Sequence, residues 1–140
     1  MAQYADQADL SRFGLPAAAT SGLASADLDA QLRAASSVAD SYIASRGYAT
    51  PLSDWGDDLR ASVARIAAWS ILTNLRGVNP EDPAHMAVRL GQQDAMAWLR
   101  DVSKGTANLD SRLTVTARTS PGVAQAFVTV SDDGEGTRGW

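Results

Sequence analysis

The feature that most constrains how this chain can fold is a helix-termination signal that recurs along its first 105 residues. A basic residue is followed within two positions by glycine at Arg12/Gly14, Arg46/Gly47, Arg76/Gly77 and Lys104/Gly105. A cation in the last turn interacts favourably with the exposed carbonyl groups, and glycine adopts the left-handed conformation that ends a helix. The pattern therefore predicts a series of helices, each of which ends at one of these glycines.

Candidate helix starts precede the three longer segments. Each offers a capping oxygen and negative charge to the free N–H groups of a first turn. The capping candidates are Ser25, Asp54 with Asp57, and Asp82 before Pro83. Asn79 followed by Pro80 is an alternative start for the last helix, but it would place Pro83 where a backbone N–H is needed, so Asp82 is preferred.

Between these signals, apolar residues recur at steps of three and four, which is the spacing of a helix face. The first and third long helices each have one apolar face, whereas the second is apolar around much of its circumference, which predicts a central position. A short helix over roughly residues 6–13 precedes them, and we expect Phe13 and Leu15 to close one end of the bundle. The connection over residues 46–56 is too apolar for a solvated loop, so we expect it to fold back onto the core.

Aromatic side chains are expected to contribute much of the hydrophobic stabilisation, because alanine-rich helices bury little area per residue. An aromatic side chain contributes about 2 to 3 kcal/mol when it is fully buried. The aromatic residues expected in the core are Tyr42, Trp55, Trp69 and Trp98.

Beyond Gly105 the apolar period changes from that of a helix to two. Alternating runs over residues 113–118 and 124–130 flank a turn with Pro121 at its second position and glycine at its third, as a type II turn requires. The pattern predicts a β-hairpin. An isolated two-stranded hairpin is marginal in water, and a helical bundle offers no sheet edge, so this segment is expected to need another polypeptide.

The predicted fold class is therefore mainly α. Residues 1–105 form a small helical bundle with a short N-terminal helix and three longer helices, and residues 106–140 form an extended C-terminal arm with a β-hairpin and a flexible end. We expect this arm to bind a neighbouring copy or another protein, with Trp140 as an aromatic anchor. The residues expected to make this contact are Leu113, Val115, Val123, Phe127, Val128, Val130, Arg138 and Trp140.

Charge and composition argue against several classes of protein. The 12 Lys and Arg residues are outnumbered by 16 Asp and Glu residues, which disfavours binding to nucleic-acid phosphates or anionic lipids. The absence of cysteine excludes disulfides, thiolate nucleophiles and iron-sulfur ligation. No signal peptide and no apolar run long enough to span a membrane is evident, so a cytoplasm-like setting is expected.

No group of residues in the sequence indicates a catalytic, metal or cofactor site. His85 is the only histidine, and we expect it to lie on the surface at a helix start. Asp57 and Asp58 are better explained as helix-start residues than as an acid-base pair. Residues 132–136 hint at a calcium loop but lack the alternating ligands of an EF-hand. We therefore expect no enzymatic activity.

The arginines of the second and third long helices are expected to be mostly solvated. A minority could pair with acidic residues across a subunit boundary, where the planar guanidinium gives directionality. These residues are Arg60, Arg65, Arg76, Arg89 and Arg100.

Four segments resemble, in the same order and with similar gaps, the motifs of a known family. Residues 4–14 (YADQADLSRFG) are similar to its N-terminal motif, and residues 39–52 to a motif that ends in Pro-Leu. Ile66 with Ala67 and residues 95–105 (AMAWLRDVSKG) resemble its later motifs, although Trp69 stands where a tyrosine is usual. The family is the small Mu-like head-tail connector group of tailed phages and prophages, also called head completion or adaptor proteins.

The resemblance, which covers roughly residues 3–109, implies a structural protein of the virion. Such proteins form a ring, commonly of twelve copies, beneath the portal, where the ring extends the DNA channel and gives the tail a docking surface. The implied partners are the portal protein, a tail or stopper protein and further copies of the chain, with DNA only as passing channel content and no membrane. The implied location is the head-tail interface of the virion, and the host cytoplasm during assembly.

An alternative function is that of a small helical regulator that binds DNA through a helix-turn-helix. The charge distribution disfavours it, because neither the second nor the third long helix has a cationic face.

Overall fold

The computed structural model describes residues 3–52, 54–107 and 109, and within these residues all regular secondary structure is helical. The mainly α class is therefore confirmed for this part of the chain. The predicted hairpin over residues 113–130 and the eight predicted contact residues, Leu113 to Trp140, lie outside the described residues. In chain order the helical segments are α1 (Gln7–Asp9), η1 (Leu10–Gly14), α2 (Ala17–Thr20), α3 (Ser25–Arg46), α4 (Asp57–Ile71), η2 (Leu72–Arg76) and α5 (Pro83–Lys104).

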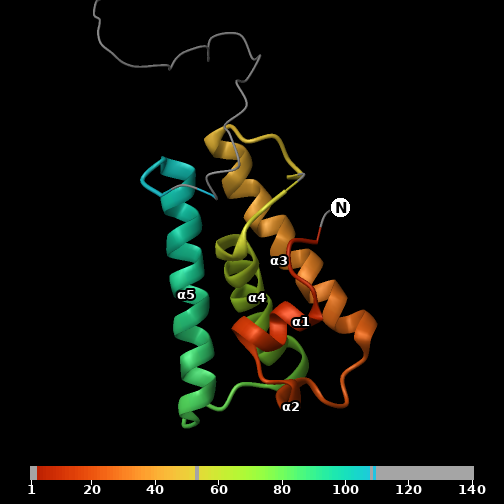
Figure 1. Ribbon diagram of the computed structural model, residues 1–140. Helices are drawn as coiled ribbons and strands as arrows, with labels where there is room; N and C mark the ends of the chain where they lie inside the picture. Colours follow the sequence, from red (N-terminus) through yellow and green to blue (C-terminus); the bar gives the residue numbers. More distant parts are fainter. Residues whose placement is uncertain (1–2, 53, 108, 110–140) are drawn as a thin grey trace, which may run out of the picture.

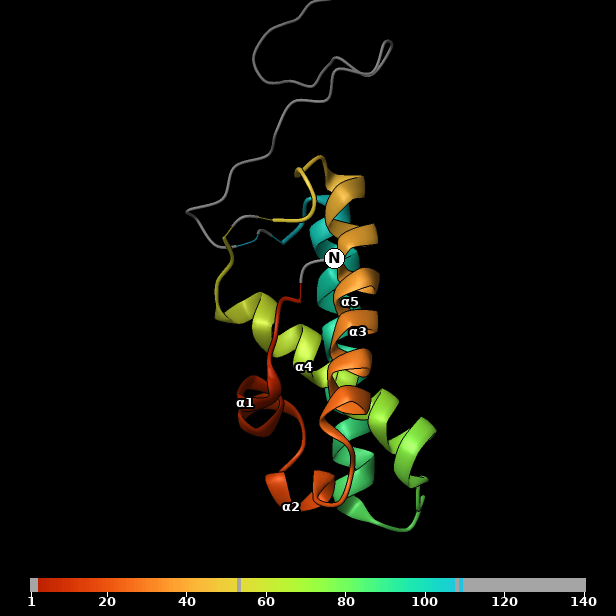
Figure 2. The ribbon, with the colours of Figure 1, turned by 90° about the vertical axis from the view of Figure 1, so that its right-hand side faces the viewer.

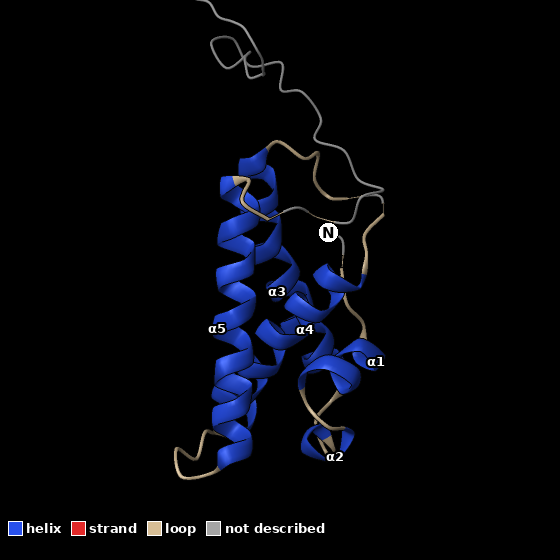
Figure 3. Cartoon of the chain, turned by 60° about the vertical axis from the view of Figure 1, so that its left-hand side comes forward, coloured by secondary structure: helices blue, strands red, loops and turns tan. Residues whose placement is uncertain are grey.

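Helix α4 lies at the centre of the bundle (Figure 1), as its apolar circumference predicts. Helices α3 and α5 pack against it and against each other, whereas α1 and η1 cover its opposite side (Figure 2). The view in Figure 3 shows the same order, with α4 between α5 and α1. A helix enclosed from two sides must bury polar as well as apolar positions, and Ser62 is accordingly buried beside Val63 and Ala64.

The core is built mainly from aliphatic side chains and alanine, together with the buried tyrosines Tyr4 and Tyr48. The aromatic residues that were expected in the core, Tyr42, Trp55, Trp69 and Trp98, pack against it but are only partly buried. Alanines on α3 and α4 allow the helices to approach closely. The narrow space between them is filled by leucine, isoleucine and valine, and the indoles pack at the edge of the core. The fully buried large aliphatic residues are Leu10, Leu32, Ile43, Leu59, Val63, Ile71, Leu99 and Val102.

Helix starts follow the predictions in part. Asp82 caps α5 by accepting the Ala84 N–H at 2.9 Å, and Pro83 occupies the first turn as expected. The prediction for Ser25 is wrong, because Ser25 is the first residue of α3 and its Oγ instead accepts Gln7 Nε2 at 2.7 Å. A long-range contact therefore takes the oxygen that a local cap would have used.

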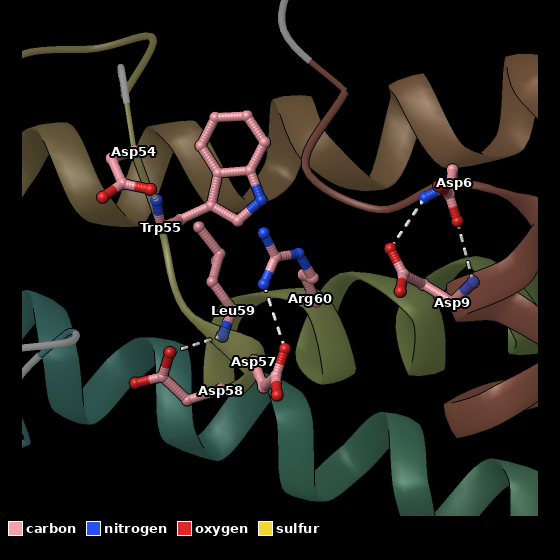
Figure 4. A network of polar contacts seen from close by, with 8 residues as sticks. All are labelled: Asp6, Asp9, Asp54, Trp55, Asp57, Asp58, Leu59 and Arg60. Atoms are coloured by element: carbon pink, nitrogen blue, oxygen red, sulfur yellow. Dashed lines mark hydrogen bonds and ion pairs between the residues drawn. The ribbon is translucent and has the colours of Figure 1, made fainter.

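The starts of α4 and of the N-terminal helix are shown in Figure 4. Gly56, not Asp54 or Asp57, occupies the cap position of α4 and offers no side chain. Asp6 and Asp9 form a reciprocal capping box at α1, in which each carboxylate accepts the backbone N–H of the other residue.

Three of the four predicted glycine terminators are confirmed. Gly47, Gly77 and Gly105 follow α3, η2 and α5 with φ values of 113°, 93° and 84°. Gly105 also lies against Arg46, because a Cβ there would come within 3.1 Å of the Arg46 Nε. This contact joins the C-terminal ends of α3 and α5.

Gly14 is the exception, because it is the last residue of η1 and the residue after it, Leu15, is extended. A Cβ at Gly14 would lie 2.8 Å from the Ala64 carbonyl oxygen and 2.9 Å from the Ala68 Cβ on α4. Glycine is therefore needed here for close helix packing and not for a left-handed turn. Leu15 is buried and Phe13 is partly buried against the core, but η1 packs along the side of α4 and not across one end of the bundle.

The connection after α3 folds back onto the core, as predicted, through the buried side chains of Tyr48 and Leu52. It is fixed there by Tyr4, which begins the N-terminal motif but which no helix or capping pattern singled out. The Tyr4 hydroxyl accepts the Leu52 N–H at 2.9 Å and donates to the Asp40 carboxylate, and the Tyr4 N–H donates to Ser36 Oγ at 2.9 Å. One residue thus joins the N-terminal segment, α3 and the connection.

The Tyr4 ring is 1% exposed and packs edge-on against Trp55, with the ring centroids 4.8 Å apart. Burial, reinforced by the hydrogen bond to Asp40, raises the pKa of Tyr4 well above its usual range. The folded state therefore favours the neutral form of the Tyr4 phenol.

We predict that Tyr4→Phe lowers the free energy of unfolding by about 1 to 3 kcal/mol, because the Leu52 N–H and the Asp40 carboxylate lose their partner. Urea unfolding followed by circular dichroism measures this. Tyr42→Phe, whose hydroxyl makes none of these contacts, is the matched control and should be near neutral. Equal effects of the two changes would contradict the role assigned to Tyr4.

The same variant should change the alkaline pH dependence. An unfolded tyrosine ionises near pH 10 whereas folded Tyr4 stays neutral, so the stability that Tyr4 contributes is complete below about pH 10 and is lost as the pH rises further. The loss of stability above about pH 10 should be smaller in Tyr4→Phe than in the parent chain.

Two glycines allow a matched test of the packing between η1 and α4. Gly14→Ala should destabilise the chain by about 1 to 3 kcal/mol through overpacking against α4. Gly91→Ala in α5 should stabilise it by about 0.5 to 1 kcal/mol, since helix propensity improves. The added Cβ of that variant would meet only the Arg65 side chain, at 3.6 Å. Thermal unfolding of both variants checks the predicted opposite signs.

Candidate interaction surfaces

The residues that the sequence offered as possible catalysts have structural partners. His85 lies in the first turn of α5, where its Nδ1 accepts the Asn79 N–H at 3.0 Å and its Nε2 lies 3.6 Å from an Asp82 carboxylate oxygen. The imidazole therefore closes the connection between η2 and α5. This agrees with the expectation of a helix-start residue.

Asp57 and Asp58 lie in the first turn of α4 (Figure 4). Asp57 pairs with Arg60 at 3.0 Å, and Asp58 accepts the N–H of Leu59 at 2.8 Å. Both carboxylates therefore have partners in the first turn of α4.

The predicted arginines divide among four environments. Arg60 is paired within α4, and Arg76 donates to the carbonyl oxygens of Ala19, at 3.1 Å, and Ser21. Arg76 thereby holds α2 against η2. Arg89 and Arg100 are exposed on α5, whereas Arg65 is partly buried at a groove described next.

A groove of about 250 Å³ opens where η1, α4 and α5 meet. Its walls are made mainly of small or apolar residues, because glycine and alanine at the contact leave space beside the larger Phe13 and Val88. The lining residues are Phe13, Gly14, Pro16, Arg65, Ala68, Ala84, Ala87, Val88 and Gly91. We call this feature the α4–α5 groove.

The α4–α5 groove has a definite charge. Arg65 is the one charged residue among its lining residues, and its aliphatic stem lies against Gly91, within 3.6 Å of the position a Cβ would take. At the rim, the Arg12 guanidinium carbon lies 5.3 Å from the centre of the Phe13 ring. The groove therefore suits an apolar group that carries negative charge beside it.

A second surface is the side of α5 that faces away from α4. Leu90 is 60% exposed there, which is the largest exposure among the described large hydrophobic residues. With about 100° per residue, Ala97, Asp101 and Asp94 lie within about 40° of Leu90 around the helix, and Arg89 and Arg100 lie about 80° to 100° away on one flank. All of these residues except Leu90 are polar or small, and all are exposed. We call this the outer face of α5.

Neither surface was among those predicted from the sequence. Leu90 could have been found, since it is a leucine that lies off the apolar stripe of its own helix. The groove had no such signal, because it arises from small side chains in three separate segments.

Within the described residues, no three potential metal-binding side chains come together, and no helix is long and apolar enough to cross a membrane. The predicted arm residues, among them Phe127 and Trp140, fall beyond that part of the chain. Their role as contact residues therefore stays a prediction.

Comparison with known proteins gives one family. A family model described as bacteriophage Mu, Gp36, matches residues 3–128, which includes the whole helical bundle and much of the predicted arm. Neither a curated protein nor a solved structure matches the chain.

Proposed function

The chain belongs to the bacteriophage Mu Gp36 family, and we propose that it is a head-tail connector. The family itself indicates a phage structural or assembly protein. In the connector role, copies of the chain form a ring beneath the portal, extend the DNA channel and provide the surface on which the tail docks. The family match is the observation that carries the proposal, because it covers both the bundle and residues 106–128 of the predicted arm.

The outer face of α5 supports a role in assembly. A closed ring needs head-to-tail contacts, in which two different surfaces of one chain meet. An exposed Leu90 with acidic residues on its own side of the helix and a basic flank beside it offers both apolar burial and charge pairing to a neighbour. We assign this face to the contact between neighbouring copies.

The C-terminal arm is the segment that we assign to the portal. The residues Leu113, Val115, Val123, Phe127, Val128 and Val130 form the alternating apolar pattern, and Arg138 and Trp140 follow it. A strand edge supplied by the portal, or by a neighbouring copy, would pair with this pattern. The ring would contact a tail or stopper protein and enclose the passing DNA, at the head-tail interface of the virion. The proposed role needs no catalysis and no cofactor.

The proposal predicts a complex of defined mass with the portal protein of the same phage. Native mass spectrometry of the full chain alone, of the portal alone and of the mixture is the test. The expected result is a complex in which connector copies match the portal subunits in number, about twelve of each. A mixture that shows only the separate components would overturn the proposal, as would a salt-dependent gel shift with duplex DNA, which would favour a DNA-binding regulator.

We predict that Leu90→Glu reduces assembly without loss of folding. Leu90 is 60% exposed, so the unfolding free energy should change by no more than about 0.5 kcal/mol. The ring or portal-bound fraction should fall at least tenfold, because a charge replaces the apolar centre of the contact. Ala49→Glu, an exposed change in the connection after α3, is the control and should assemble normally.

A further inference from the structure

The α4–α5 groove is the described feature that the proposed function leaves unused. Its volume of about 250 Å³ lies below the range of small-molecule and cofactor pockets, which is about 300 to 1,000 Å³. It is closer to the space taken by one large side chain. Its apolar walls and single cation, Arg65, further restrict the occupant to an apolar group accompanied by negative charge.

The chain itself carries such a group. Trp140 follows a stretch that contains Asp132, Asp133, Glu135 and Arg138, so an indole and a net negative charge lie within nine residues. Glycines at 134, 136 and 139 leave the indole without apolar neighbours in sequence. A tryptophan in that setting gains from any apolar pocket that it can reach, and tryptophan is among the residues that most often anchor an interface.

We propose that Trp140 docks into the α4–α5 groove of its own chain, with the acidic residues before it beside Arg65 and Arg12. The connector role is not required for this inference. The groove residues of α5 run from Ala84 to Gly91, and the chain leaves the bundle after Lys104 at the other end of the helix (Figure 1). Thirteen residues of helix separate Gly91 from Lys104, a distance of about 20 Å.

The length of the connecting segment fits this span. An unstructured chain of the 31 residues that follow Leu109 would have a root-mean-square length of about 30 Å. If residues 113–130 form the predicted hairpin, the ten residues after it still reach up to about 33 Å. A tether whose natural length is close to the span gives a high effective concentration, which favours the groove of the same chain over that of another molecule.

Docking in the same chain would make the arm less available to other proteins. The apparent affinity of a segment for a partner falls in proportion to the fraction that is free to bind. Capture of the arm by a portal would therefore have to displace Trp140 from the groove.

Fluorine NMR of the full chain labelled with fluorotryptophan tests the proposal. The four tryptophans give separate signals, and Trp140→Phe identifies the one from residue 140. We expect this signal to be shifted from the position of an unstructured tryptophan and to stay unchanged on dilution. Ala87→Phe, which fills the groove from α5, should return it to the unstructured position, whereas Ala97→Phe on the outer face of the same helix should not.

Three results would overturn the proposal. One is a Trp140 signal at the unstructured position in the parent chain, and another is a shifted signal that Ala87→Phe leaves unchanged. A third is a shift that disappears on dilution, which would assign the groove to the arm of a neighbouring copy. Phe127→Ala is the control for the other aromatic residue of the arm and should leave the Trp140 signal in place. All of these results are independent of portal binding, so failure here would leave the connector proposal standing.

Discussion

The structure depends on the close contact between the backbone of η1 and the centre of α4. Gly14 lies so near the Ala64 carbonyl oxygen and the Ala68 side chain that a Cβ at this position would overlap both. This contact allows the N-terminal segment to cover the side of α4 that α3 and α5 leave open. Without it, a helix that is apolar around most of its circumference would expose part of that surface to water.

The contact needs an anchor, because α1 and η1 together span only eight residues. Helices of this length are not stable alone. Tyr4 supplies the anchor by hydrogen bonding to Asp40 on α3 and to the Leu52 N–H, and the Asp6–Asp9 capping box orders the turn that follows. The N-terminal segment is thus held at both ends, by polar bonds at Tyr4 and by packing at Gly14. The α4–α5 groove lies at the edge of this packing, since the small residues that permit close approach also leave space beside it.

The local parts of this arrangement could be predicted from the sequence, and the long-range parts could not. Gly47, Gly77, Gly105 and Asp82 act on the turn that contains them, so their patterns were sufficient to place the helix ends. Gly14 follows the same local pattern, but a contact with a helix some 50 residues later decides its conformation. Residue volumes explain in the same way why the tryptophans are only partly buried, because alanines on facing helices decide how much space an indole can have.

The candidate surfaces follow the same division. The buried stripe of α5, with Ala95, Leu99 and Val102, could be predicted from its spacing, and Leu90 could have been noticed as the leucine outside it. The groove could not be predicted, since it requires knowledge of how three segments meet. Tyr4 was likewise beyond the reach of sequence patterns, because its partners Asp40 and Leu52 lie 36 and 48 residues away.

Helix α5 carries both candidate surfaces, and its geometry allows them to act independently. Val88 and Gly91 face the groove, whereas Leu90 and Ala97 lie about 100° or more around the helix from Gly91. The buried stripe fixes α5 against α4, so a neighbour that binds the outer face need not change the groove. A ring contact at Leu90 and a Trp140 docked beside Val88 can therefore coexist. Release of Trp140 from the groove would then depend on a partner, such as the portal, that competes for the arm, and not on ring closure itself.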